Sequence, residues 1–190
     1  MAFNVCVYCG ARPGRGASDM AAAHALGAAL ADQGWGLVYG GGRVGLMGAV
    51  AAGVKGGGGT IIGVIPEGLL RREQGDDQGG ELVITGTLRE RKAIMDTRAD
   101  AFVALPGGFG TLEELVETMT LRQLGYHHKP IIIFNLDGYY DPLLAFFGHA
   151  IASGFVRADE RTVYQVAATV DEVVAALSIQ DAELSKNAIR

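Results

Sequence analysis

Two glycine-rich segments of this chain have the residue types and spacing to hold a ligand. The first spans Gly40–Gly48 and the second spans Pro106–Glu114. Each follows a short apolar run that predicts a strand, and each precedes a segment that predicts a helix. Because glycine lacks a Cβ, backbone N–H groups in such a turn can approach an anion at the N-terminus of the following helix. The sequence therefore predicts that these turns bind a phosphate or a ribose.

The first turn matches the pattern G-x-G-x-x-G through Gly40, Gly42 and Gly45. A dinucleotide site would need an acidic residue about 20 positions further on, and Glu67 stands near there but follows a proline. A close helix–strand contact without a ligand is a second interpretation. A different phosphate or ribose ligand is the third, and we favour it. The residues of this turn expected to contact the ligand are Gly41, Gly42, Gly45 and Met47.

The second turn places three glycines and a threonine before a helix. It is not a Walker A loop, because no Gly-Lys-Ser/Thr follows. A phosphate here would rest on backbone N–H groups and on the positive end of the helix dipole. The expected contacts are Gly108, Gly110 and Thr111.

Glu114 allows two interpretations. Thr111 and Glu114 have the spacing of a capping box, in which the glutamate only satisfies a backbone N–H group. Alternatively, its position about 4.5 Å along the helix from Thr111, at 1.5 Å per residue, resembles the step from a 5′-phosphate to its ribose. Local sequence does not separate a structural role from a catalytic one.

The segment Arg89–Arg98 predicts a charged helix just before the strand that carries the second turn. Arg91 and Arg98 are seven residues apart and so share a helix face, with Met95 between them. Such a face could offer cations and a soft apolar contact to a nucleotide. A solvated, salt-bridged face is the other interpretation. The candidates for substrate binding are Arg91, Lys92, Met95 and Arg98.

Short β-branched runs alternate with longer helical segments along the whole chain. This alternation predicts one α/β domain with a Rossmann-like, doubly wound and mostly parallel sheet and helices on both faces. We expect the domain to cover residues 1–180, with a tail at 181–190. The expected strands are Val5–Cys9, Gly36–Tyr39, Thr60–Ile65, Glu81–Thr85, Ala101–Leu105 and Lys129–Phe134. The expected helices are Asp19–Gln33, Leu46–Lys55, Arg89–Arg98, Leu112–Leu124, Pro142–Ser153 and Asp171–Leu177. The segments Gly53–Gly59 and Gln74–Gly80 predict surface loops.

Composition excludes several classes of protein. The net charge of −5 argues against binding of nucleic-acid polymers, which select for basic surfaces. Cys6 and Cys9 cannot complete a four-ligand zinc site, and we expect both to be buried, unpaired residues at a strand end. We expect no metal and no cofactor. No apolar run reaches the length of a membrane helix and no signal peptide is visible, so we expect no membrane association and a cytoplasmic location.

Taken together, these motifs resemble the LONELY GUY family of cytokinin riboside 5′-monophosphate phosphoribohydrolases, which are often labelled lysine decarboxylases. The likeness rests on Gly40–Gly48, on Arg91-Lys92-Ala93 and on the second turn with Glu114, and it extends from Val5 to about Leu177. It implies a homodimer that hydrolyses the N-glycosidic bond of a small-molecule nucleotide, with AMP as a further candidate substrate. It also implies that Arg91 and Glu114 are the catalytic pair.

The chain departs from the family pattern at several positions. The family commonly has Ser-Ser where Ala11-Arg12 stands, which alters contacts near the phosphate or ribose. It often has histidine in place of Arg89. It also often has an aromatic residue in place of Leu121, and we expect this second difference to alter base preference. None of these positions belongs to the proposed catalytic pair.

Three other functions are weighed against hydrolysis. Lysine decarboxylation needs pyridoxal phosphate on a Schiff-base lysine, and no lysine here stands in such a context. A nicotinamide oxidoreductase built on the first turn leaves the second turn unexplained. A non-catalytic carrier of a nucleotide or of molybdenum cofactor would share the fold, but it does not require Arg91 together with Glu114.

Overall fold

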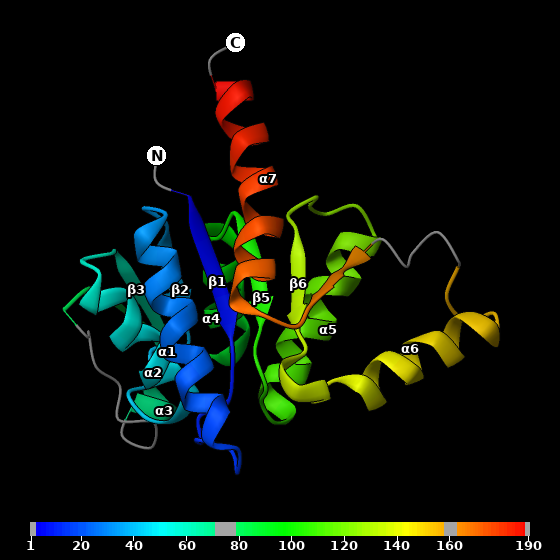
Figure 1. Cartoon of the computed structure of the whole chain (residues 1–190), viewed down its shortest axis with the longest axis horizontal. Helices are drawn as coiled ribbons and strands as arrows, with labels where there is room; N and C mark the ends of the chain where they lie inside the picture. The colour runs from blue at the N-terminus through cyan, green and yellow to red at the C-terminus, as the bar shows by residue number, and fades with distance from the viewer. Residues whose placement is uncertain (1–2, 71–78, 158–162, 189–190) are drawn as a thin grey trace.

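A computed structural model of the chain describes residues 3–70, 79–157 and 163–188 (Figure 1). Its centre is a seven-stranded parallel sheet in the order β4-β3-β2-β1-β5-β6-β7. The strands are β1 (Asn4–Tyr8), β2 (Gly36–Tyr39), β3 (Ile61–Pro66), β4 (Glu81–Thr85), β5 (Ala101–Ala104), β6 (Ile131–Phe134) and β7 (Gln165–Ala167). The helices are α1 (Ala17–Asp32), α2 (Gly45–Gly56), α3 (Glu67–Leu70), α4 (Leu88–Arg98), α5 (Phe109–Gln123), η1 (Leu136–Gly138), α6 (Asp141–Ala152) and α7 (Val170–Ala188). The predicted α/β fold is confirmed.

Helices cover both faces of the sheet, because the central strands are apolar on both sides. Val5 and Val7 of β1 point into a core that α1, α2 and α7 cover. Cys6 and Tyr8 of the same strand belong to a second core. Helices α4 and α5 cover this other face of the sheet (Figure 1). Side chains buried on both faces explain why β1 has an unbroken apolar sequence rather than an alternating one.

The strand order reverses beside β1. From β1 the chain builds β2, β3 and β4 on one side, and then β5, β6 and β7 on the other. In open α/β sheets, ligands bind outside the carboxyl ends of the strands at such a switch point. The N–H group of Gly10 donates a hydrogen bond to the Pro106 carbonyl at 3.0 Å, which ties the ends of β1 and β5 together. The fold therefore places the second glycine turn at the switch point.

Some predicted boundaries are wrong. Helix α2 continues to Gly56, so the segment predicted as the loop Gly53–Gly59 is partly helical. Gly53 is buried where α2 packs against α1, and a Cβ there would overlap the His24 carbonyl of α1. This glycine therefore allows the two helices to pack closely. Helix α7 runs to Ala188 rather than Leu177, and it enters the segment predicted as a tail.

The remaining elements were either missed or lie partly outside the described residues. The short elements α3, η1 and β7 were not predicted, since each has only three or four residues. Most of the predicted loop Gln74–Gly80 lies outside the described residues. Within the described ranges, no helix is both long and apolar enough to span a membrane.

Candidate active site

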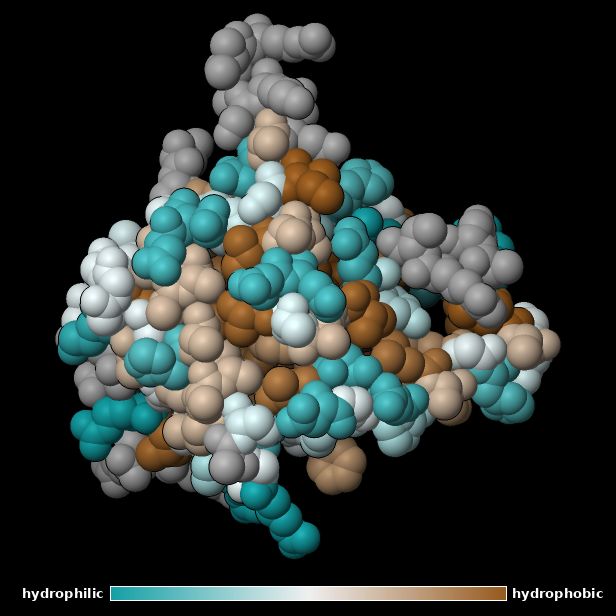
Figure 2. Space-filling view, viewed as in Figure 1, coloured by the Kyte–Doolittle hydropathy of each residue, from teal (hydrophilic) through white to brown (hydrophobic). Residues whose placement is uncertain are grey.

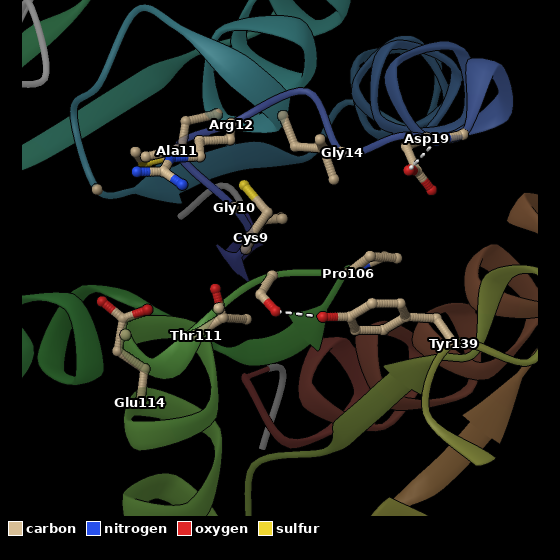
Figure 3. A pocket seen from close by; sticks show the side chains of 18 of the residues that line it. Cys9, Gly10, Ala11, Arg12, Gly14, Asp19, Pro106, Thr111, Glu114 and Tyr139 are labelled. Carbon is tan, nitrogen blue, oxygen red and sulfur yellow. Dashed lines mark hydrogen bonds between the residues drawn. The ribbon is translucent and has the colours of Figure 1, made fainter. Parts of the chain in front are cut away.

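A cavity of about 700 Å³ lies at the switch point, at the carboxyl ends of β1 and β5 (Figure 3). The β1–α1 loop forms one wall, and the β5–α5 turn with the start of α5 forms the opposite wall. The beginning of α2, Arg91 of α4 and Tyr139 complete the lining. Six of the predicted site residues line the cavity, namely Met47, Arg91, Gly108, Gly110, Thr111 and Glu114.

Helix α5 begins at Phe109, with Gly108 as its N-cap. Thr111 is therefore the third residue of the helix rather than its cap, and the capping-box interpretation of Glu114 is wrong. The helix starts three residues earlier than predicted because Gly108 supplies the extended backbone that an N-cap needs. Glu114 consequently lies six residues beyond the cap, about 9 Å along the axis at 1.5 Å per residue.

The glycines of the second turn have different roles. A Cβ on Gly107 would overlap the Thr111 side chain, so Gly107 is needed for the turn itself. A Cβ on Gly108 or on Gly110 would meet no protein atom within 4 Å. The protein therefore does not need glycine at these two positions for packing, and the open space beside them faces the cavity.

Arg91 and Glu114 form an ion pair in the cavity wall. Arg91 Nη2 lies 3.7 Å from Glu114 Oε1, and the two side chains are 8% and 11% exposed. Arg91 Nε donates a hydrogen bond to the Val64 carbonyl at 3.0 Å. The guanidinium lies over Gly40, where a Cβ would overlap it. The β3 carbonyl and the Gly40 surface thus hold the guanidinium beside the carboxylate.

The other predicted residues of α4 do not line the cavity. Lys92 forms ion pairs with Glu113 and Glu117 of α5. Met95 is buried in the core between the sheet and the helices α4 and α5. Arg98 Nη2 forms an ion pair with Glu81 Oε1 at 3.2 Å. Arg91 and Arg98 share a face, but they lie about 10.5 Å apart along the axis. Only the first turn of α4 reaches the carboxyl edge of the sheet.

The first glycine turn holds the β1–α1 loop. Gly45 adopts a φ of 63°, and a Cβ there would overlap the Ala11–Arg12 backbone. The N–H group of Leu46 donates a hydrogen bond to the Gly10 carbonyl at 3.0 Å, so this N–H group of α2 already has a partner. Gly41, Gly42 and Gly45 are absent from the cavity lining, whereas Gly40, Leu46 and Met47 belong to it. The turn lacks the open helix N-terminus that a dinucleotide site requires.

The predicted site residues leave out one wall of the cavity and one aromatic residue, although the resemblance pointed to Ala11-Arg12 as lying near the phosphate or ribose. The missed wall is the segment 9–16 with Asp19, from which only Pro13 is absent in the lining. Tyr139 also lines the cavity, and its hydroxyl donates a hydrogen bond to the Gly107 carbonyl (Figure 3). The strand order would have predicted this wall, because the loop after a central strand at a switch point faces the ligand crevice.

Cysteine and metal chemistry have little support in this cavity. Burial raises the pKa of the Cys9 thiol well above its usual value, and the negative charge of Glu114 raises it further. Cys9 is therefore an uncharged thiol at neutral pH, and a thiol is a far weaker nucleophile than a thiolate. Among the described residues, no cluster of three His, Cys, Asp or Glu side chains could hold a metal ion. No lysine belongs to the described lining.

The fold and this cavity define a doubly wound α/β protein with its candidate site at the switch point and an Arg–Glu pair in the wall. Residues 47–177 match the family described as possible lysine decarboxylase. The cytokinin riboside 5′-monophosphate phosphoribohydrolase LOG of Oryza sativa subsp. japonica is 49% identical over 170 residues, which cover 90% of this chain and 70% of that protein. A phosphoribohydrolase of Arabidopsis thaliana with the same activity in its name is 45% identical over 170 residues, covering 90% of this chain and 79% of that protein. The chain belongs to the LONELY GUY family of cytokinin riboside 5′-monophosphate phosphoribohydrolases.

Solved structures support the fold. The Moco carrier protein of Chlamydomonas reinhardtii superposes with a TM-score of 0.73 at 24% identity, and the match covers 96% of this chain and 99% of that one. This similarity concerns the arrangement of the sheet and helices.

Proposed function

We propose that this protein hydrolyses the N-glycosidic bond of cytokinin riboside 5′-monophosphates and releases the free base and ribose 5-phosphate. The observation that carries the proposal is the largely buried Arg91–Glu114 pair beside the N-terminus of α5, which faces the cavity. Relatives that carry this activity in their names are 43–51% identical over most of the chain. AMP is a further proposed substrate, because it carries the same ribose 5-phosphate.

In the proposed complex the substrate phosphate lies over Gly108, Gly110 and Thr111, where the N-terminus of α5 faces the cavity. The ribose then extends toward Glu114. As the bond between C1′ and the base nitrogen breaks, its electron pair leaves with the base and positive charge develops on C1′ and O4′. The Glu114 carboxylate stabilises this charge. Water supplies a hydroxyl group to C1′ and its proton to the base, which balances the reaction.

We also propose that two copies of the chain associate. Large apolar side chains are exposed along α4 and α5, including Leu88, Phe109 and Val116. Phe109 is 92% exposed at the N-terminus of α5, next to the cavity. Burial of such side chains between two copies would remove apolar surface from water.

Selectivity for the phosphate tests the proposed function. Isopentenyladenosine monophosphate should be hydrolysed with a far higher kcat/KM than isopentenyladenosine. Each charge-assisted hydrogen bond to the phosphate contributes about 1.5–3 kcal/mol, and the nucleoside makes none of them. Release of free base and of ribose 5-phosphate is the measurement. Equal kcat/KM for the two compounds would remove the phosphate site from the proposal, and binding without base release would favour a carrier.

Gly108→Ala and Gly110→Ala should weaken nucleotide binding without loss of folding. The added methyl group meets no protein atom, so it projects into the space assigned to the phosphate. We expect KM for the monophosphate to rise at least about tenfold, the loss of roughly one charge-assisted hydrogen bond. Gly107→Ala is the contrasting variant, because its methyl group overlaps Thr111 and should lower the melting temperature. Unchanged KM in folded Gly110→Ala protein would mean that this turn is structural.

A further inference from the structure

Five charged side chains belong to the described cavity lining, and three of them already have partners. Arg91 and Glu114 pair with each other, so together they contribute almost no net charge. The Asp19 carboxylate, in the first turn of α1, accepts a hydrogen bond from the N–H group of Gly16 at 3.3 Å. The other two are Arg12 and Arg15, both exposed on this loop. Within the described part of the chain, neither guanidinium forms an ion pair or a hydrogen bond.

The backbone before Arg12 is held from two sides. Gly10 donates a hydrogen bond to the Pro106 carbonyl and accepts one from the N–H group of Leu46, each at 3.0 Å. Gly45 packs directly on the Ala11–Arg12 peptide. The start of this loop is thus fixed to both glycine turns, which gives Arg12 a defined position relative to the N-terminus of α5.

Arg12 lies on the wall opposite the start of α5. Figure 3 shows Arg12 on one side of the cavity, with Thr111 and Glu114 on the other. Hydrophilic side chains project from the molecule where the β1–α1 loop lies (Figure 2). A ligand bound between these walls therefore meets backbone N–H groups of α5 on one side and a guanidinium on the other.

We propose that Arg12 binds the 5′-phosphate of the substrate from the side opposite the α5 N-terminus. This inference rests on the proposed function and assigns its phosphate specificity to a particular side chain. A nucleotide phosphate carries nearly two negative charges at neutral pH, and the paired Arg91 does not neutralise them. A guanidinium can donate two parallel hydrogen bonds to phosphate oxygens. A neutral hydroxyl side chain at this position would donate one uncharged hydrogen bond.

Arg15 is the competing candidate on the same loop. It lies between Gly14, with a φ of 75°, and Gly16, beyond the part of the loop that the two turns hold. Its guanidinium therefore has a less defined position. Ordering a long side chain on a less constrained backbone costs more entropy, so we assign the phosphate to Arg12.

The test compares Arg12→Ala, Arg12→Lys and Arg15→Ala with Arg89→Ala, which removes an exposed arginine outside the cavity lining. In Arg12→Ala, kcat/KM for isopentenyladenosine monophosphate should fall about 10- to 100-fold, mainly through KM, as expected for a lost charge-assisted contact. The kcat/KM for isopentenyladenosine should stay unchanged. Arg12→Lys should retain part of the preference for the phosphate, and Arg89→Ala should match the unaltered protein.

Three outcomes would overturn the assignment. Wild-type KM for the monophosphate in Arg12→Ala would mean that other groups hold the phosphate. Equal losses for the nucleotide and the nucleoside would mean that Arg12 only shapes the loop. A full loss in Arg15→Ala would transfer the role to Arg15.

Equilibrium binding separates failure of this inference from failure of the proposed function. Calorimetric titration of the unaltered protein and of Arg12→Ala with ribose 5-phosphate and with inorganic phosphate needs no turnover, because neither compound has an N-glycosidic bond. Weaker binding of both compounds to the variant supports the role of Arg12 even if no base is released. Equal binding to both proteins overturns it even if hydrolysis is observed.

Discussion

Glu114→Gln is expected to lower kcat by at least about a hundredfold, equivalent to roughly 3 kcal/mol of transition-state stabilisation. The substitution preserves side-chain shape and removes the charge that faces the developing positive charge on the ribose. Substrate affinity should change much less, because the ground state lacks that charge. The measurement is steady-state release of free base from isopentenyladenosine monophosphate, with KM determined in parallel.

Glu113→Gln is the matched control for this variant. Glu113 is the preceding residue of the same helix, but its side chain is 59% exposed and pairs with Lys92 outside the cavity lining. It should keep normal kcat. Since Gly108 rather than Thr111 caps α5, neither substitution removes a cap. Glu113→Gln should melt near the unaltered temperature, whereas Glu114→Gln leaves the Arg91 guanidinium without its carboxylate and should melt lower. A folded Glu114→Gln protein with near-normal kcat would refute the mechanism and favour the carrier function.

Arg91→Ala is expected to reduce kcat to a similar extent and to reduce stability more than Glu114→Gln does. The variant loses the hydrogen bond to the Val64 carbonyl and leaves the nearly buried Glu114 carboxylate without this cation. Removing one partner of a buried ion pair destabilises proteins by about 3–5 kcal/mol, and the partial exposure of this pair places the effect at the lower end. The measurements are kcat and the melting temperature.

Two further variants check the role of Arg91. Arg89→Ala, on the same helix but exposed, should change neither activity nor stability appreciably. The double variant Arg91→Ala/Glu114→Gln should be little worse in kcat than either single variant, because residues that act as a unit give non-additive losses. Additive losses would mean that the two residues act independently, which would contradict the paired mechanism.

The sequence by itself determined the class of fold. The unbroken apolar runs such as Val5–Cys9 could be buried only between two layers of helices, and their alternation with helical segments required a parallel, doubly wound sheet. The strand-to-helix context of the second glycine turn predicted a ligand site, and the resemblance to the LONELY GUY family predicted Arg91 and Glu114 as the catalytic pair. The class of fold and the second turn follow from local periodicity and local backbone chemistry, which a single sequence contains.

Only the tertiary structure decided which of the candidate residues meet. Spacing placed Arg91 and Arg98 on one helix face, but the direction in which α4 crosses the sheet decided that only Arg91 reaches the cavity. Spacing also allowed a capping box at Thr111, but α5 begins three residues earlier than predicted, so Thr111 lies inside the helix and cannot be its cap. How far a helical residue lies from the edge of the sheet depends on how the helix packs on the strands, which are distant in the sequence.

The first glycine turn and the β1–α1 loop show the same limit. Gly45 matched a ligand-binding pattern, yet it supports the peptide that leads to Arg12, which lies 33 positions earlier in the sequence. Tyr139 reaches the Gly107 carbonyl from a segment after β6. The strand order brings these segments together at the carboxyl ends of β1 and β5, and strand order follows from packing of the whole chain rather than from any local pattern.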